Sequence, residues 1–509
     1  MKYSNPIIKG FYPDPSICKA DEYFYLVCSS FQFFPALPLF KSKDLVNWEQ
    51  IGHCITRKSQ LNLNGVDASA GIFAPTIRYN NGRFYVVVTN TSGGGNFYLY
   101  TDDINGEWSE PIKVNRGGID PSLMFDGEKN YFMSNGEDDN GENGVSLCEI
   151  DIETGKLLSP AKCICKGTGG RFIEAPHLYH IGDYYYLLVA EGGTEYGHTE
   201  CMFRSKTPYG PYESCPHNPI LTNRNLGGYI VQGAGHADII EDDKGQWWMV
   251  NLAFRQISMW RQFHNLGREV FLEPVYWTED GWLKVGADGT SRLGFEVTDK
   301  GCVICDPADP YDEESSPEKK WSLDPKTACY IRCPDYGNYR FENNSVFLTG
   351  CEEKLNSKGN VTFVGDRQKD FICTAQVEID GGTLGDKTRC GITAYMNENN
   401  HYDISVERAE SGFRISGSIT VGGVRLKSNE FISDNDSIKL LISTSHHTYT
   451  LHAFDDGEEM PFGEGWINLG AMETKYLSTE VCEGFTGVII GIFCEDTGSD
   501  KKPVKFTII

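Results

Sequence analysis

The sequence lacks an apolar run long enough to cross a membrane. It contains no stretch of about 18 apolar residues, roughly the minimum for a spanning helix. The first residues, MKYSNPIIKGFYPDP, also lack the apolar stretch and the small-residue cleavage site of a secretory signal. We therefore expect a cytoplasmic protein that has no membrane partner.

Basic residues are few relative to acidic ones. The chain has 46 Lys and Arg against 71 Asp and Glu, which gives a net charge of −25 at pH 7. Nucleic acids and anionic membranes are polyanions, so a surface of this sign disfavours both as partners. The charge balance favours a neutral ligand.

Long amphipathic helical patterns are absent as well, whereas aromatic residues are plentiful. Phe, Tyr and Trp make up 12% of the chain, and these residue types favour half-buried strands. At 509 residues the chain exceeds what one hydrophobic core normally supports. We expect an all-β protein of two domains.

The 17 cysteines show no paired spacing of four zinc ligands. Cys302 and Cys305 form one CxxC and Cys163 and Cys165 one CxC, whereas a structural zinc site normally takes four ligands. Many cysteines, such as Cys28, fall within strand-like runs. We interpret them as reduced, buried thiols rather than as metal ligands or a disulfide framework.

Five segments share one outline: a small or acidic residue, usually before Pro, then a strand, a polar turn and an aromatic strand. They cover residues 12–30, 73–90, 119–135, 174–192 and 235–254. Their anchors lie 60, 46, 55 and 61 residues apart, at Asp14, Ala74, Asp120, Ala175 and His236. A period of this length leaves room for the four strands of a propeller blade. The repeat predicts a five-bladed β-propeller in which the residue that opens each repeat faces the central axis.

The composition changes near residue 300. Residues 301–324 are rich in Pro, Asp, Glu and Ser, as expected of a linker. Strand alternation resumes in 325–509, in runs such as FICTAQVEI that are separated by Gly, Asn and Asp turns. We predict a propeller over 1–300, a linker over 301–324 and a β-sandwich over 325–509.

Three acidic residues stand at the heads of these repeats: Asp14 in YPDPS, Asp120 in IDPS and Glu174 in FIEAPHLY. Each Asp also suits an ordinary turn, but Glu174, which follows an apolar pair, is poorly explained as a solvated surface charge. Hydrolysis of an acetal needs a proton for the departing oxygen and an activated water or nucleophile, so two carboxyl groups in opposite protonation states are the minimum. A third acid can hold the proton on the first. The three acids predict acid/base chemistry in one axial pocket.

Six motifs, in their order along the chain, resemble glycoside hydrolase family 43: GFYPDPSI, GIFAPTIRY, IDPSLMFDG, RFIEAPHLY, GAGHADII and LGREVFLEPVYW. That family contains inverting β-xylosidases and α-L-arabinofuranosidases, and its β-xylosidase-like members carry a C-terminal β-sandwich. The resemblance implies that Asp14 is the general base, that Glu174 is the general acid, and that Asp120 tunes and orients Glu174.

The resemblance also implies a set of residues around the sugar: Phe31, Phe73, Thr194, His236, Arg268 and Phe485. The fixed fork of donors on Arg268 suits sugar hydroxyls, with a rim salt bridge as the alternative. Thr194 is equally explained as a loop residue, and the Phe residues as core packing. Phe485 would otherwise enter the catalytic funnel from the sandwich.

His236 has two interpretations. In some relatives the corresponding His forms hydrogen bonds near the acids, and in others it holds Ca²⁺ through water. The resemblance therefore allows Ca²⁺ near His236, and the chemistry itself requires no cofactor.

We expect an inverting exo-glycoside hydrolase that releases terminal xylose, and also arabinofuranose, from short xylo-oligosaccharides or arabinoxylo-oligosaccharides. One alternative is an enzyme that is mainly an α-L-arabinofuranosidase. From another class, the alternative is a carbohydrate-binding propeller without catalysis. Phe73 stands where many xylosidases have Trp, and the acidic loop after Asp120 lacks a Trp found in some. The preferred sugar, chain length and assembly into a homo-oligomer stay open.

Overall fold

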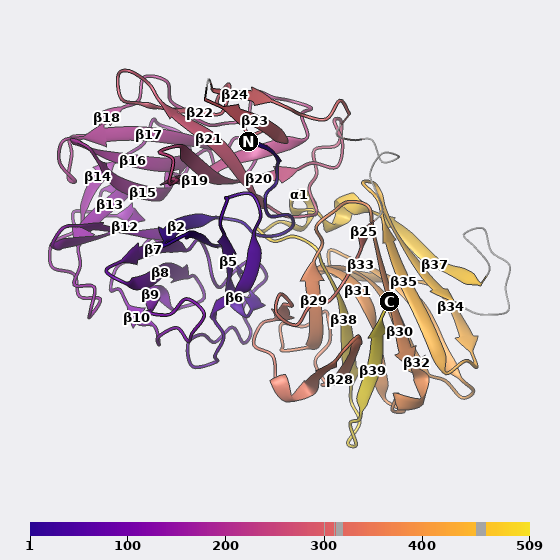
Figure 1. The fold of residues 1–509 in the computed structure, drawn as a ribbon. Coiled ribbons are helices and arrows are strands. Elements are labelled where there is room, and N and C mark those ends of the chain that lie inside the picture. Colours follow the sequence, from indigo (N-terminus) through magenta and orange to yellow (C-terminus); the bar gives the residue numbers. More distant parts are fainter. Residues whose placement is uncertain (300, 310, 312–318, 455–464) are drawn as a thin grey trace.

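Two β-rich domains lie side by side in the computed structural model, which describes residues 1–299, 301–309, 311, 319–454 and 465–509 (Figure 1). Within these ranges the single α-helix, α1, covers only Thr479–Cys482. No described helix is long and apolar enough to cross a membrane. Short 3₁₀ turns occur in the second domain at η1 (Tyr336–Asn338), η2 (Gly381–Thr383) and η3 (Thr474–Leu477).

The first domain consists of five four-stranded antiparallel sheets. The first blade contains β2 (Ser16–Ala20), β3 (Tyr23–Val27), β5 (Ala36–Ser42) and β6 (Glu49–Ile55). The second contains β7 (Thr76–Asn80), β8 (Arg83–Asn90), β9 (Gly95–Thr101) and β10 (Ile112–Lys113). The third contains β11 (Ile119–Asp126), β12 (Lys129–Glu137), β13 (Asn143–Glu149) and β14 (Lys162–Cys165). The fourth contains β15 (Glu174–Ile181), β16 (Tyr184–Glu191), β17 (Thr199–Ser205) and β18 (Glu213–Ser214). The fifth contains β19 (Val231–Glu241), β20 (Trp247–Arg255), β21 (Glu269–Trp277) and β22 (Leu283–Val285).

The first strands of the five blades form a closed inner ring. β2 contacts β7 and β19, β11 contacts β7 and β15, and β15 contacts β19. Each of the five predicted hairpin segments supplies the first two strands of one blade, in the predicted order. The prediction of a five-bladed propeller is confirmed.

Strands in the middle of a blade are buried on both faces because neighbouring blades cover them. Almost all of β8 is buried. Its alternate residues Val86 and Val88 pack toward the first blade, whereas Tyr85 and Val87 pack with residues of the third. This explains why these strands appear in the sequence as continuous apolar runs rather than as alternating ones.

A small additional sheet follows the fifth blade. It joins the N-terminal strand β1 (Lys2–Ser4) to β23 (Gly294–Thr298) and β24 (Gly301–Ile304). The range 301–324, predicted as a linker, thus begins with a paired strand, because Cys302 and Ile304 pack against the propeller core. Within that range, residues 310 and 312–318 lie outside the described residues, and the domain boundaries stay predictions.

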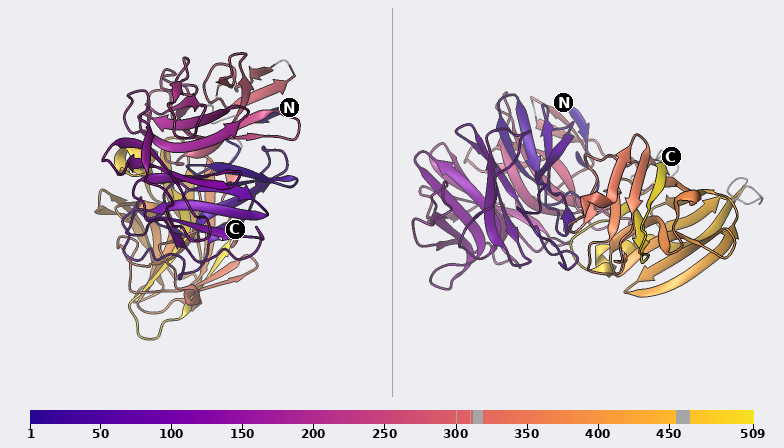
Figure 2. Two further views of the ribbon diagram at one scale, coloured as in Figure 1. Left: turned by 90° about the vertical axis from the view of Figure 1, so that its left-hand side faces the viewer. Right: turned by 90° about the horizontal axis from the view of Figure 1, so that it is seen from below.

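The second domain is a sandwich of two sheets, seen from two further directions in Figure 2. One sheet contains, in spatial order, β27 (Tyr339–Glu342), β28 (Ser345–Thr349), β39 (Pro503–Ile508), β30 (Cys373–Asp380), β35 (Ser437–Thr444), β36 (Thr448–Phe454) and β37 (Trp466–Glu473), with β25 (Lys319–Lys320) beside β30. The other contains β29 (Thr362–Arg367), β38 (Ile489–Asp496), β31 (Thr388–Asn397), β32 (Asn400–Arg408), β33 (Phe413–Val421) and β34 (Val424–Ser433). Alternate residues of facing strands fill the core between them. The predicted sandwich is confirmed.

The two domains share an apolar interface. Phe11 and Phe33 of the propeller cluster with Phe363 and Phe493 of the sandwich. β4 (Phe33–Phe34) also pairs with β26 (Tyr330–Ile331) across the boundary. Phe31 belongs to the same cluster. The interface therefore extends to the pocket described in the next subsection, which Phe31 also lines.

Candidate active site

Four of the five blades bend at the residue that opens their repeat. Asp14, Asp120, Ala175 and His236 have φ angles of 55°, 52°, 51° and 53°. This left-handed region is uncommon for residues other than glycine, although Asp tolerates it better than most. In the fourth blade Ala175, not Glu174, occupies the bend. The acidic residue of this blade therefore stands one position earlier than the aspartates of the first and third blades.

One pocket of about 230 Å³ lies at these bends. All nine residues singled out from the sequence line it: Asp14, Phe31, Phe73, Asp120, Glu174, Thr194, His236, Arg268 and Phe485. Seven further residues also line it: Ala74, Ile119, Arg171, Phe172, Gly193, Glu195 and His198. Most of these are direct sequence neighbours of a predicted residue, and that adjacency was the signal that could have found them.

Asp14 is held as a carboxylate. It is 4% exposed. Its Oδ1 accepts a hydrogen bond from Arg268 Nη1 at 2.7 Å and its Oδ2 accepts one from Ser29 Oγ at 2.5 Å. Burial raises the pKa of this carboxyl, but Arg268, His236 and the Ser29 hydroxyl outweigh burial and lower it below its ordinary value. Asp14 is therefore ionised at neutral pH and able to accept a proton from water.

Glu174 is held in the opposite protonation state. Burial and the negative charge of Asp14 raise the pKa of Glu174 to about 7, against the opposing charges of Arg268 and Arg171. A carboxyl with this pKa retains its proton throughout the acidic range and keeps it on about half of the molecules at pH 7. The pocket thus combines an ionised acid and a protonated one.

Asp120 is 8% exposed and lies beside the Glu174 segment. Its Oδ2 accepts a hydrogen bond from the backbone N–H of Ala175 at 3.1 Å. Burial, followed by the charges of Glu174 and Asp14, raises the pKa of Asp120 well above its usual range. Asp120 therefore anchors the backbone next to Glu174. The pKa of each of these two carboxyls is raised above its ordinary value.

Arg268 is 5% exposed and lies within the pocket rather than on its rim. Besides Asp14, its Nη1 donates to Thr194 Oγ1 at 2.9 Å, and its Nη2 donates to the backbone oxygen of Phe485 at 3.3 Å. One guanidinium thus connects a proposed reacting group, a pocket loop and the second domain.

Three phenylalanines form one wall. Phe485 stacks on Phe31 with ring centroids 5.8 Å apart, and Phe73 meets both rings at 5.1 Å and 5.8 Å. Phe485 comes from the sandwich, and its backbone N–H donates to Ser69 Oγ of the propeller at 2.9 Å. The sandwich therefore contributes a side chain to the pocket and closes one side of it.

His236 does not lie in a set of metal ligands. Its Nδ1 is 3.8 Å from Asp14 Oδ1, and burial lowers its pKa even though Asp14 opposes this, so the ring is neutral. Ca²⁺ takes six to eight oxygen ligands. Across the part of the chain that the structure describes, no three His, Cys, Asp or Glu residues are placed to hold a metal ion. The side chains around His236 fit a hydrogen-bonding role better than a calcium site.

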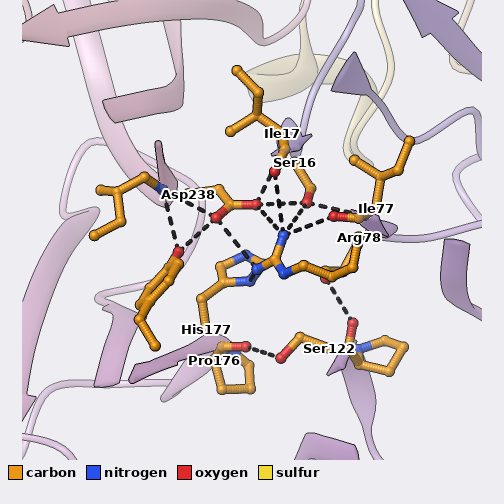
Figure 3. Close-up of polar contacts among 12 residues, drawn as sticks. Ser16, Ile17, Ile77, Arg78, Ser122, Pro176, His177 and Asp238 are labelled. Carbon is orange, nitrogen blue, oxygen red and sulfur yellow. Dashed lines mark hydrogen bonds and ion pairs between the residues drawn. The ribbon is translucent and has the colours of Figure 1, made fainter. Parts of the chain in front are cut away.

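A second ring of polar residues lies two positions beyond the residues that open the five repeats. Its members are Ser16, Thr76, Ser122, His177 and Asp238. Figure 3 shows several of them converging around Arg78. Asp238 Oδ2 accepts hydrogen bonds from Ser16 Oγ at 2.6 Å and from Arg78 Nη1 at 2.7 Å.

Hydrogen bonds of this polar ring cross every boundary between blades. Ile77 N–H donates to Ser16 Oγ, and Thr76 Oγ1 donates to the oxygen of Pro121. Ser122 Oγ donates to the oxygen of Pro176 at 2.5 Å. The remaining boundaries are crossed by Tyr179 OH, which donates to Asp238, and by the Ser16–Asp238 bond. Because ring members stand two residues beyond each bend, the ring fixes the spacing of the three acids.

The Asp238–Arg78 pair should carry a large part of the stability of the propeller. The Asp238 side chain is fully buried and that of Arg78 is 15% exposed. Asp238→Asn leaves the guanidinium uncompensated, so we expect a loss of about 3–5 kcal/mol in the free energy of unfolding, measured by urea denaturation. Asp243→Asn in the same blade, at a pair whose Asp side chain is 76% exposed, is the control and should change stability little. Equal effects of the two substitutions would contradict this role.

The fold and the pocket define a class: a β-propeller with an ionised carboxyl beside carboxyls of raised pKa on its axis, equipped for acid/base hydrolysis of an acetal. Residues 3–283 match the family model for glycosyl hydrolases family 43, and residues 329–509 match that for the beta xylosidase C-terminal concanavalin A-like domain. The chain belongs to glycosyl hydrolases family 43 and is a glycoside hydrolase.

Similar proteins cover both domains. A non-reducing end α-L-arabinofuranosidase of Bacteroides ovatus is 35% identical, over 99% of this chain and 93% of its own length. A xylosidase/arabinosidase of Butyrivibrio fibrisolvens is 36% identical, over 97% and 96%. Among solved structures, the Bacteroides ovatus xyloglucan PUL GH43B superposes with a TM-score of 0.86 at 34% identity, over the full length of both chains.

Proposed function

We propose that this hydrolase is an inverting, exo-acting glycosidase that removes terminal xylose and arabinofuranose from short xylo-oligosaccharides or arabinoxylo-oligosaccharides. The observation that carries the proposal is the pairing of ionised Asp14 with protonated Glu174 in one small pocket. The pairing does not suit a carbohydrate-binding propeller without catalysis, an alternative that the family membership also excludes.

The reaction follows from the two protonation states. Glu174 gives its proton to the glycosidic oxygen as the bond from that oxygen to the anomeric carbon breaks. A water molecule forms the new bond to the anomeric carbon and loses a proton to Asp14. Asp120 holds the Glu174 segment in place through the Ala175 N–H. Water attacks from the side opposite to the leaving group, so the anomeric configuration inverts.

Exo action is supported by a wall on one side of the pocket and by its small volume. The wall of Phe31, Phe73 and Phe485 blocks one side. The volume of about 230 Å³ is below the range of about 300–1,000 Å³ typical of pockets for drug-sized ligands. A pocket of this size suits one terminal sugar ring rather than the middle of a chain.

The relatives support activity on both sugars, because one is an α-L-arabinofuranosidase and another is a xylosidase/arabinosidase. A chain that is mainly an α-L-arabinofuranosidase is the second candidate. Nitrophenyl β-D-xyloside and nitrophenyl α-L-arabinofuranoside distinguish the two by kcat/KM, and NMR of the first-formed sugar reports its anomeric configuration. The proposed substrates would be refuted if the enzyme hydrolysed neither of the two nitrophenyl glycosides. They would also be refuted if it hydrolysed neither xylobiose nor an arabinoxylo-oligosaccharide. A retained configuration would refute inversion.

We further propose that the reaction needs no metal and takes place in the cytoplasm. Two carboxyl groups and water supply the chemistry, and cysteines such as Cys18, Cys28 and Cys390 are buried free thiols, which suits a reducing compartment. Chelator treatment should leave kcat/KM unchanged, whereas a loss restored by Ca²⁺ would reinstate calcium near His236. Analytical ultracentrifugation measures whether the protein assembles into a homo-oligomer.

The pH profile should be set on its alkaline side by Glu174. The acid must be protonated, so kcat/KM should fall as pH rises through about 7. The base must be ionised, and because the pKa of Asp14 is lowered, the acidic limb should lie below the ordinary range of an aspartate. Initial rates at low substrate concentration over a pH series measure both limbs. A rate that still increases at pH well above 7 would contradict the role of Glu174.

A further inference from the structure

Phe172 is an exposed aromatic residue at the edge of the pocket, two positions before Glu174. Phe172 is 56% exposed. Its φ of 53° lies in the left-handed region, where a bulky residue is a genuine outlier. Such backbone strain is unfavourable, persists only where the surroundings impose it, and clusters at functional sites.

The surroundings of Phe172 do impose this conformation. Glu191 is 2% exposed, and its carboxylate accepts hydrogen bonds from the backbone N–H groups of Thr168 and Gly170 at 2.5 and 2.8 Å. On the other side of the segment, Gly192 N–H donates to the oxygen of Arg171 at 2.6 Å. The chain leading into Phe172 is thus tied at both ends to β16 and the residue after it.

The room around Glu191 shows that this segment is closely fitted. A Cβ atom built on Gly167 or on Gly170 would lie 2.3 Å from an oxygen of the Glu191 carboxylate, so only glycine fits at either position. Gly167 and Gly170 of the GTGG sequence before Arg171 therefore let this segment pack closely against one buried acid.

Arg171 completes the exposed edge. Its guanidinium lies 4.7 Å from the centre of the Phe172 ring, and its Nη2 is 3.4 Å from Glu195 Oε2. Both side chains lie close over Gly193, where an added Cβ would be 3.0 Å from Arg171 Nη2 and 3.2 Å from Phe172 Cδ2. An aromatic face and a set of hydrogen-bond donors therefore stand together at the open edge of the pocket.

This edge lies on the side of the proposed acid. Glu174 must reach the glycosidic oxygen, so the sugar that leaves has to lie near the segment that carries Glu174. The wall of Phe31, Phe73 and Phe485 closes another side. Apolar faces of sugars can stack on aromatic rings, and guanidinium donors suit hydroxyl groups. Single exposed apolar residues are ordinary on protein surfaces. They do not ordinarily combine a left-handed backbone conformation with a preceding segment held by hydrogen bonds to a buried acid, as Phe172 does.

We propose that Arg171 and Phe172 form the binding site for the leaving sugar, a neutral pyranose ring that stacks on Phe172 and accepts hydrogen bonds from Arg171. This specificity site rests on the proposed function, since it assumes that Glu174 protonates the bond between the two sugars.

Phe172→Gly tests the site because it removes the ring and tolerates the positive φ. The variant should lose about tenfold in kcat/KM on xylobiose, which corresponds to one stacking contact of about 1.4 kcal/mol. On β-D-xylosyl fluoride, which has no leaving sugar, kcat/KM should stay within about twofold of the wild type. Phe172→Tyr should restore xylobiose cleavage. Tyr79→Ala, at an exposed aromatic outside the pocket, should leave both rates unchanged.

The outcomes separate the two proposals. A wild-type chain that cleaves neither xylobiose nor the fluoride overturns the proposed function and this site together. A wild-type chain active on both, with the same ratio of the two kcat/KM values in Phe172→Gly, overturns the leaving-sugar site alone. Thermal unfolding should show Phe172→Gly to be at least as stable as the wild type, because strain is relieved, so a lost rate cannot be assigned to unfolding.

Discussion

Asp14→Ala should lower kcat/KM by about 10²–10⁴-fold on every glycoside, whatever its leaving group. This is the usual contribution of a positioned general base, and Asp14 is the pocket carboxyl that its surroundings hold ionised. Because the lost step is activation of water, the loss should not depend on how easily the leaving group departs. Initial rates on nitrophenyl and dinitrophenyl glycosides measure it.

Azide provides the control for this variant. A small anion can enter the space left by the carboxylate and bond to the anomeric carbon without needing a base. Asp14→Ala should therefore regain turnover in azide and form a glycosyl azide of inverted configuration, whereas the wild type should not be accelerated. Undiminished hydrolysis by Asp14→Ala, or a retained azide product, would contradict the assignment of the base.

Glu174→Gln should instead produce a loss that depends on the leaving group. On xylobiose, whose leaving alkoxide needs a proton, we expect kcat/KM to fall by about 10²–10⁴-fold. On a dinitrophenyl glycoside, whose leaving group departs as a stable anion, the loss should be far smaller. The alkaline limb of the pH profile should also disappear for the activated substrate, because the group whose pKa is raised to about 7 is gone.

Glu195→Gln is the matched control for Glu174→Gln. Glu195 also lines the pocket, but it is an exposed acid that pairs with Arg171. Its substitution should leave the alkaline limb in place. Equal losses of Glu174→Gln on both classes of leaving group would show that Glu174 has a role other than proton donation.

The propeller could be predicted because its blades repeat a local pattern. The strand pairs, their turns and their spacing are all visible within about twenty consecutive residues, as in 73–90. The pairing of β24 in the range predicted as a linker was not visible, because its partner β23 and the core beneath it are tertiary features.

The candidate site was predicted in composition but not in local geometry. The residues named from the sequence line the pocket, whereas their catalytic roles stay predictions that rest on the family resemblance. The sequence grouped Glu174 with Asp14 and Asp120 as acids at the heads of their repeats, although the fourth repeat itself was anchored at Ala175. The structure places Ala175 at the bend, and an offset of one residue depends on backbone angles that residue types do not reveal.

The edge formed by Arg171 and Phe172 was missed for a different reason. Neither residue type is typical of acid/base chemistry, and strain at Phe172 is a property of the folded backbone. The glycines before Arg171 were the available signal. Their significance depends on Glu191, about twenty residues away, and only the folded chain shows that contact.

The polar ring beneath the acids bears on how five similar blades assemble in one order. Modules built to one plan can be confused with one another while a chain folds. The ring members are not interchangeable: three hydroxyl residues, one imidazole and one carboxylate stand at the five equivalent positions. The carboxylate of Asp238 forms an ion pair with Arg78 of the second blade. Replacing the second or the fifth blade by a copy of another blade would leave one of these two charges in the centre without its counterpart, so the ring restricts which blades can occupy those two places.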